Sequence, residues 1–174
     1  MKTVLIVEDE KMIRQGIKTM IMRSGVPIET IMECNNGETA LEILKEQEID
    51  VMFTDIRMPK MDGIELVQKM QSLEHIPLTV AISGYDDFAY AVEMLRNGVR
   101  EYILKPIERE KITEILKKLN AEIESRKEKE ENNQKIGYQQ MRHLMLSDEI
   151  SGEEQRTIES QYADHFYTGN YYVC

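Results

Sequence analysis

Two groups of acidic residues in this chain could do chemistry. Glu8 and Asp9 directly follow an apolar run at residues 3–7, and Asp55 directly follows another at residues 51–54. Burying an unpaired carboxylate is unfavourable, so Asp55 must lie at an exposed strand end, bind a cation or carry a proton. Carboxylates gathered in one crevice are typical of a hard-cation site, because Mg²⁺ is usually held by one or two carboxylates and water.

A hydroxyl and an amine end two further apolar runs. Ser83 follows residues 78–82, and Lys105 ends a short run immediately before Pro106. Pro106 favours an extended backbone at Lys105, which keeps this lysine at the strand end. A carboxylate beside Mg²⁺ and an ammonium group could attack phosphorus and become an aspartyl phosphate. Asp55 is therefore the candidate nucleophile, with Ser83 and Lys105 as candidate ligands of the phosphoryl oxygens.

The elements that must position these residues alternate along the first 119 residues. Apolar runs predict strands at residues 3–7, 27–34, 51–54, 78–82 and 102–104. Amphipathic spacing predicts helices at 11–23, from 36–37, from 62–63, at 87–97 and from about 107. This alternation indicates an α/β fold with a doubly wound, five-stranded parallel sheet, which we expect to be flavodoxin-like with strand order 2-1-3-4-5.

Such a fold would bring the acidic residues together. The carboxyl ends of parallel strands meet at one edge of the sheet, where ligands bind. With the first and third strands adjacent, Glu8, Asp9 and Asp55 are expected to lie within a few ångströms of one another. Their mutual repulsion makes this arrangement unfavourable without a cation.

Composition limits the classes of function. The 174 residues carry a formal net charge of −10, from 32 acidic and 22 basic residues, which argues against nucleic-acid binding through a basic face. No apolar run approaches the ~20 residues of a membrane span, and the start of the chain is too acidic for a signal peptide. Cys34 and Cys174 are far apart and read as reduced thiols. We expect a cytoplasmic protein without membrane contact.

The region beyond the last predicted strand differs from the rest. Apolar residues at helical spacing give way to the charged stretch ESRKEKEENNQK at 124–135. We expect a first domain at residues 1–122, a charged helical linker at 123–150, and the start of a further unit or a truncated tail at 151–174. The broken heptad pattern argues against a sustained coiled coil.

Residues 1 to about 120 resemble the receiver domain of two-component response regulators. The resemblance rests on VEDE at 7–10, TDIRMPKMDG at 54–63, SGYDD at 83–87 and YILKP at 102–106, in that order and each at a strand end. Glu8 stands where many relatives have Asp, which leaves Asp9 in place as a metal ligand.

The resemblance implies a role for each matching residue. Asp9, Asp55 and the backbone carbonyl of Arg57 would ligate Mg²⁺ with help from Glu8, and Asp55 would take a phosphoryl group from a sensor histidine kinase. Ser83 and Lys105 would bind that group, and Tyr102 would swing inward as a switch. The resemblance also implies that Pro59 and Gly63 shape the loop beside Asp55.

A finer resemblance extends to the YesN-like regulators, whose output domain is of the AraC type. No basic helix-turn-helix pair occurs in these 174 residues, so DNA binding would require an output domain absent here. We expect a homodimer to form on phosphorylation through the helix at 88–97, the fifth strand and the helix from 107. Apolar contacts there would come from Tyr90, Val92, Leu95 and Val99.

Three alternatives remain. A magnesium-dependent aspartate-nucleophile phosphohydrolase would need a general acid–base where this chain has Arg57, which cannot accept a proton. A flavodoxin-like flavin carrier would need a phosphate-binding loop after the first strand, where this chain is acidic. A chemically silent receiver-like interaction module would be expected to lack Asp9, Asp55 or Lys105, all of which are present. We therefore expect a phospho-acceptor switch with at most slow self-dephosphorylation.

Overall fold

The computed structural model describes the backbone of residues 1–84 and 88–146. Within the helices, the side chains at 88–91, 130, 134 and 139–146 are outside the description. Expectations about Tyr90 as a contact residue and about residues 151–174 therefore fall outside the described part of the chain.

Five parallel strands form one sheet in the order β2-β1-β3-β4-β5. The strands are β1 (Thr3–Val7), β2 (Thr30–Cys34), β3 (Val51–Asp55), β4 (Leu78–Ser83) and β5 (Glu101–Leu104). Their residues are largely apolar because both faces of the sheet are covered. The expected flavodoxin-like order is confirmed.

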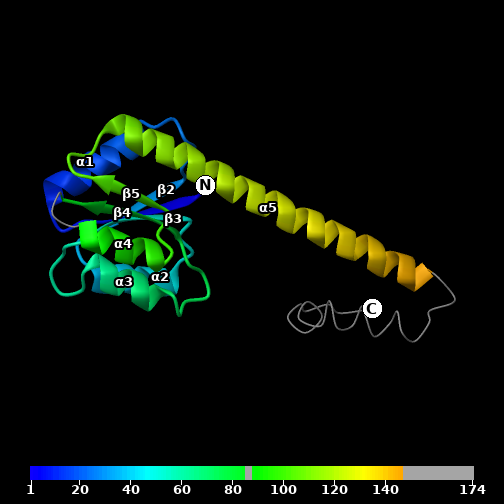
Figure 1. Ribbon diagram of the computed structural model, residues 1–174. Helices are drawn as coiled ribbons and strands as arrows, with labels where there is room; N and C mark the ends of the chain where they lie inside the picture. The colour runs from blue at the N-terminus through cyan, green and yellow to red at the C-terminus, as the bar shows by residue number, and fades with distance from the viewer. Residues whose placement is uncertain (85–87, 147–174) are drawn as a thin grey trace. The chain divides into compact units, whose positions relative to one another are not determined.

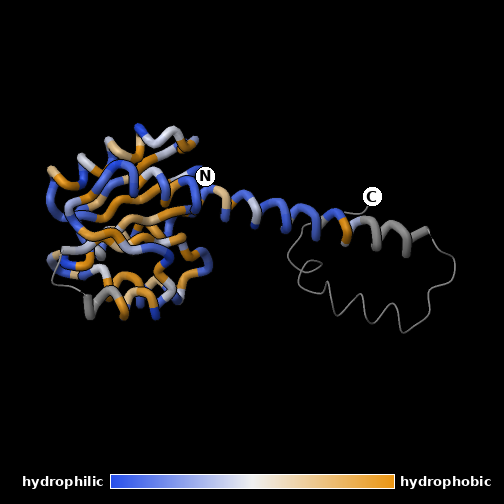
Figure 2. Tube along the Cα trace, turned by 45° about the horizontal axis from the view of Figure 1, so that its top comes forward, coloured by the Kyte–Doolittle hydropathy of each residue, from blue (hydrophilic) through white to orange (hydrophobic). Residues whose placement is uncertain are grey.

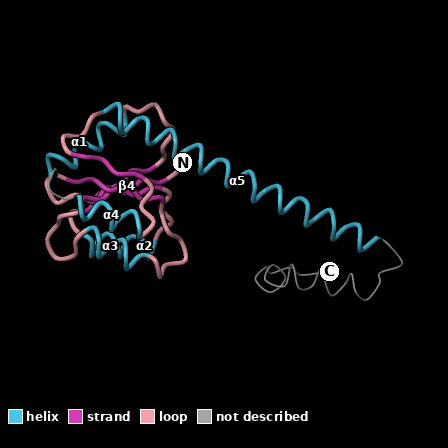
Figure 3. The backbone as a smooth tube through the Cα atoms, viewed as in Figure 1, coloured by secondary structure: helices cyan, strands magenta, loops and turns pink. Residues whose placement is uncertain are grey.

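Helices cover both faces of the sheet (Figures 1 and 3). The helices are α1 (Lys11–Met22), α2 (Gly37–Glu46), α3 (Gly63–Met70), α4 (Phe88–Arg96) and α5 (Arg109–Leu146). Helices α1 and α5 pack on one face, and α2, α3 and α4 pack on the other. Every crossover between parallel strands therefore contains a helix, as the sequence predicts.

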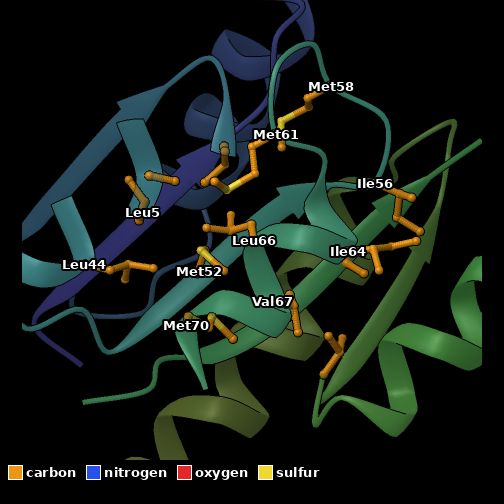
Figure 4. Packing of buried hydrophobic residues seen from close by; sticks show 14 of the residues in the cluster. Leu5, Leu44, Met52, Ile56, Met58, Met61, Ile64, Leu66, Val67 and Met70 are labelled. Carbon is orange, nitrogen blue, oxygen red and sulfur yellow. The ribbon is translucent and has the colours of Figure 1, made fainter. Parts of the chain in front are cut away.

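Alternate residues of each strand fill two separate cores. Val4 and Ile6 pack with the apolar side chains of α1 and α5, whereas Leu5 and Val7 pack with those of α2 and α3. Figure 4 shows the second core, where labelled side chains from β1, β3 and α3 point toward one another. The two-residue period of the strands thus divides one apolar run between two faces.

The strand boundaries differ from the predicted ones at four places, one of which is the start of β5 at Glu101 rather than Tyr102. β2 begins at Thr30 rather than Pro27, because the carbonyl of Lys2 accepts hydrogen bonds from Glu29 and Thr30 where the pairing with β1 starts. β3 and β4 each extend one residue further than predicted, so Asp55 and Ser83 are the last residues of their strands. Both side chains are consequently fixed by the sheet rather than by a loop.

The chain divides into two units, residues 1–127 and residues 128–174. The boundary falls within α5, whose residues Ile112, Leu116, Leu119 and Ile123 are buried in the first unit. Figure 2 shows that the hydrophobic colouring of the sheet gives way to mostly hydrophilic residues further along this helix. Among the described residues, no helix is both long and apolar enough to cross a lipid bilayer.

Candidate functional site

The carboxyl ends of β1 and β3 bring three acidic side chains together. Glu8, Asp9 and Asp55 each offer a carboxylate oxygen within 4.8 Å of the others. The register that pairs Val7 with Thr54 places the next residues, Glu8 and Asp55, side by side at the sheet edge. Glu8 and Asp55 are buried, whereas Asp9 is exposed. Three carboxylates at this spacing fit a hard cation such as Mg²⁺.

Lys105 connects the two buried acids. Its Nζ lies 2.9 Å from Asp55 Oδ2 and 3.0 Å from Glu8 Oε2. The Lys105 backbone N–H donates to the Ser83 carbonyl at 2.7 Å, which extends the pairing of β4 and β5 to this residue. One ammonium group thus faces two buried carboxylates, and part of their charge is left for another cation to balance.

The pKa of Glu8 reflects its burial first and its acidic neighbour second. Burial and the neighbouring Asp55 carboxylate raise the pKa of Glu8 to about 7, although the hydrogen bond from Lys105 acts in the opposite direction. Burial alone would lower the pKa of Lys105, but its hydrogen bonds to Asp55 and Glu8 raise that pKa above the usual value. Near neutral pH the lysine is therefore charged, and Glu8 is near its titration midpoint.

Ser83 lies on β4, the strand next to that of Asp55, and Tyr102 lies on β5, the strand beyond it. Ser83 is fully buried at the end of β4, and its Oγ donates to the Gly84 carbonyl at 3.0 Å. Tyr102 pairs with Ala81 in the sheet, and its ring packs against the core beneath α2 and α3. The Tyr102 hydroxyl is buried and makes no hydrogen bond among the described residues.

The loop after Asp55 is held tightly against the end of β3. Asp55 Oδ1 accepts a hydrogen bond from Ile56 N–H at 2.8 Å, and Gly63 N–H donates to the Ile56 carbonyl at 2.8 Å. A Cβ on Gly63 would lie 2.2 Å from the Asp55 carbonyl oxygen, so only glycine fits there. This close approach explains why a glycine follows the acidic residue at this spacing.

A hollow of about 460 Å³ opens beside the acidic cluster. It is lined by Asp9 and by residues of the loop, including Arg57, Met58 and Pro59. Arg57 is exposed, so its side chain borders the entrance rather than the core. The acidic cluster is therefore open to solvent from this side.

Sequence reasoning missed three residues that surround the site. Arg14 donates to backbone carbonyls beside the acidic cluster, Glu33 pairs with Arg14, and Gly37 contacts the loop after Asp55. The sequence placed Arg14 on an amphipathic helix and marked Gly37 only as part of a helix start. No sequence motif marks any of the three, because each reaches the site through a contact with a segment that is distant in the sequence.

A model of the response regulator receiver domain matches residues 4–117. The chain belongs to the response regulator receiver family. Domains of this family are typically phospho-acceptors rather than catalytic enzymes, and an acidic cluster like that of Glu8, Asp9 and Asp55 is typical of a receiver magnesium site.

Curated relatives of this receiver are longer proteins. The transcriptional regulatory protein YesN of Bacillus subtilis is 31% identical over 123 residues, which are 71% of this chain and 33% of that protein. HptR of Staphylococcus aureus is 33% identical over 117 residues, which are 67% of this chain and 45% of that protein. The matched region thus covers less than half the length of these relatives.

Solved receiver structures share the fold. The receiver domain of AraT from Geobacillus stearothermophilus is 34% identical, with a TM-score of 0.63, and the match covers 72% of this chain and 97% of that one. A two-component transcriptional regulator AraC from Clostridium phytofermentans is 32% identical, with a TM-score of 0.65, and the match covers 74% and 99% of the two chains. The match to this AraC regulator and the match to YesN bear out the resemblance to regulators of that group.

Proposed function

We propose that this receiver accepts a phosphoryl group on Asp55 and changes conformation in response. The observation that carries the proposal is the bridge from Lys105 Nζ to Asp55 Oδ2 and Glu8 Oε2 beside a third carboxylate. Asp55 is the acid of this cluster that ends a strand and pairs with Lys105, whereas Asp9 lines the hollow beside the cluster. A positioned carboxylate paired with an amine is suited to nucleophilic attack.

The transfer conserves charge and atoms. A carboxylate oxygen of Asp55 attacks the phosphorus of a phosphohistidine on a sensor histidine kinase, and the P–N bond breaks. The electron pair leaves with the imidazole nitrogen, which takes up a proton. Lys105 then moves from a carboxylate to a phosphoryl oxygen, and the Ser83 hydroxyl turns from the Gly84 carbonyl to donate to another.

The residues present fit a magnesium ion. Asp9, Asp55 and the Arg57 carbonyl would hold it, with Glu8 assisting, and the ion would supply positive charge against the incoming phosphoryl oxygens. The fit rests on the three clustered carboxylates, two of which are buried and share one lysine.

We expect at most slow self-dephosphorylation. Arg57 occupies the position two residues after the acceptor and cannot serve as a general base. The phosphorylated form would then persist long enough to act as a signal, with Tyr102 moving as part of the switch.

Phosphorylation is expected to promote a homodimer through α4 and β5. Val92, Leu95 and Leu104 are exposed apolar residues there, whereas Val99 belongs to the core. Sedimentation velocity with and without a phosphoryl mimic tests this expectation. A monomer under both conditions would contradict it.

We further propose that the phosphorylated receiver controls a transcriptional output. YesN and HptR are named as transcriptional regulatory proteins, so we infer that this receiver controls transcription in the cytoplasm through a DNA-binding output domain of the AraC type. Within the chain we propose a receiver at residues 1–122, a helical linker at 123–150 and a further unit or tail from 151.

The test is phosphoryl loading. The protein is incubated with Mg²⁺ and a small phosphodonor, and intact mass is read for wild type and Asp55→Asn. We expect a gain of about 80 Da in the wild type alone, corresponding to one phosphoryl group. No gain with Mg²⁺ shown to be bound would instead favour a chemically silent interaction module.

A further inference from the structure

A short segment that supplies no site carboxylate contacts both halves of the candidate cation site. Residues 33–37, here called the 33–37 brace, comprise the end of β2, the turn that follows it and the first residue of α2. One side of the brace reaches the Glu8–Asp9 turn, and the other reaches the loop after Asp55. These two halves are also joined by the pairing of β1 with β3 and by Lys105, which pairs with both Glu8 and Asp55.

The contact with the Glu8–Asp9 turn runs through backbone groups and Arg14. The Cys34 carbonyl accepts a hydrogen bond from Glu8 N–H at 3.2 Å. Arg14 of α1 donates through Nη1 to the Glu8 carbonyl and, at 3.3 Å, to the Asp9 carbonyl. The Arg14 side chain therefore fixes the backbone that carries both carboxylates, without contacting the carboxylates themselves.

Glu33 holds Arg14 in place. A Glu33 carboxylate oxygen lies 3.7 Å from Arg14 Nε, and the same carboxylate accepts hydrogen bonds from Gln15 and Lys18. The Arg14 and Glu33 side chains are only 16% and 19% exposed, so this is not a freely moving surface pair. A carboxylate with several donors orients the guanidinium far better than an isolated exposed ion pair would.

The contact with the acceptor loop is made by Gly37. Its N–H donates to the Met61 carbonyl at 3.1 Å, and a Cβ on Gly37 would lie 2.7 Å from that oxygen and 2.8 Å from Met61 Cγ. Met61 belongs to the loop that includes Arg57, and Gly63 closes the other end of that loop on Ile56. Any side chain at position 37 must therefore displace the loop.

We propose that the 33–37 brace sets the separation between the Glu8–Asp9 turn and the acceptor loop. Arg14, Glu33 and Gly37 are then positioning residues for cation binding. The inference rests on the proposed function, because it requires Mg²⁺ to bind at this cluster. Mg²⁺ demands nearly ideal octahedral geometry, so small displacements of its oxygen ligands weaken binding.

Calorimetric titration with Mg²⁺ tests the brace in the intact chain. Gly37→Ala and Arg14→Met are expected to bind Mg²⁺ about 10-fold more weakly than wild type, the size typical of residues that orient metal ligands. Gly16→Ala is the matched control, since a Cβ there meets nothing within 4 Å. It should bind Mg²⁺ as wild type does. Arg14→Lys, which keeps the charge but loses the forked donors, should fall between wild type and Arg14→Met.

Unfolding in the presence of a chelator separates positioning from stability. Variants that are less stable but bind Mg²⁺ with wild-type affinity would overturn the brace while leaving the proposed function intact. Absence of Mg²⁺ binding by the wild type would overturn both. If Gly37→Ala does not fold, Arg14→Met and Glu33→Gln decide the question by the same titration.

Discussion

Among single residues, Lys105 and Glu8 have the largest effect on the net charge of the acidic cluster. Lys105 faces two buried carboxylates, one of which has a pKa raised to about 7. The cluster therefore holds more negative charge than its own lysine neutralises, and this makes cation binding and phosphoryl transfer compatible with the same few residues.

Lys105→Met is expected to destabilise the protein most at alkaline pH. The change removes the cation that faces Glu8 and Asp55, and we expect a loss of about 2 kcal/mol in the free energy of unfolding at pH 8 without divalent ions. The loss should shrink at pH 5, where Glu8 can bind a proton. Urea unfolding at both pH values measures the effect. Lys69→Met, which breaks an exposed pair with Glu65, serves as the control and should change little.

Glu8→Gln should have the opposite effect near neutral pH. Because the folded-state pKa of Glu8 is raised from 4.5 to about 7, its contribution to stability is fully present below pH 4.5 and is lost as the pH rises through about 7. Glutamine carries no charge, so we expect the variant to be more stable than wild type by about 1–3 kcal/mol at pH 8 and nearly equal at pH 4.5. Equal stability at both pH values, measured with a chelator present, would contradict the burial argument.

At the scale of secondary-structure elements, the loop between β3 and α3 fixes the position of Asp55. Gly63 begins α3 and lies against the Asp55 carbonyl, so the start of the helix and the acceptor share one close contact. Asp62 caps α3 by accepting a hydrogen bond from Glu65 N–H at 2.8 Å, which fixes the direction in which the loop enters the helix. The acceptor is thereby held between a strand and a capped helix.

Gly63→Ala is expected to cost about 2–4 kcal/mol in the free energy of unfolding, because the added Cβ must push the Asp55 backbone away. Phosphoryl loading of the folded fraction should also fall. Thermal unfolding and intact mass measure the two effects. The same substitution at Gly16, where there is open space, should stabilise the helix slightly.

At the scale of the whole molecule, α5 belongs to the receiver core over its first part. Ile112, Leu116 and Leu119 are fully buried, and Ile123 is 7% exposed although it lies beyond the proposed domain limit at residue 122. Glu122 also pairs with Arg100 at 3.3 Å. Ile123 therefore packs with the core of the first unit, one residue beyond the proposed limit.

A chain ending at residue 127 should be more stable than one ending at residue 122. The shorter chain loses the buried Ile123 side chain, and we expect a difference of about 1–3 kcal/mol in the free energy of unfolding. Both chains should retain Mg²⁺ binding and phosphoryl loading, because no site residue lies beyond Lys105. Equal stability of the two chains would place the end of the receiver at 122.

The order of the elements and the set of candidate site residues could be predicted from the amino-acid sequence. Apolar runs ending in Glu8, Asp55, Ser83 and Lys105 were sufficient, because parallel strands joined by helices must place their carboxyl ends at one edge. The five strands and their order are confirmed, and the boundary errors of one to three residues arise where pairing with a neighbouring strand starts or ends.

The contacts that hold these groups became visible only when distant segments were packed together. The tertiary structure showed that Glu8 is buried against Lys105 while Asp9 is exposed, that Gly63 lies against Asp55, and that Arg14 and Gly37 reach the site from outside. Strand periodicity specifies which face a residue occupies. It does not specify which residue of another segment lies a hydrogen bond away, because that depends on strand register and on the packing of helices against the sheet.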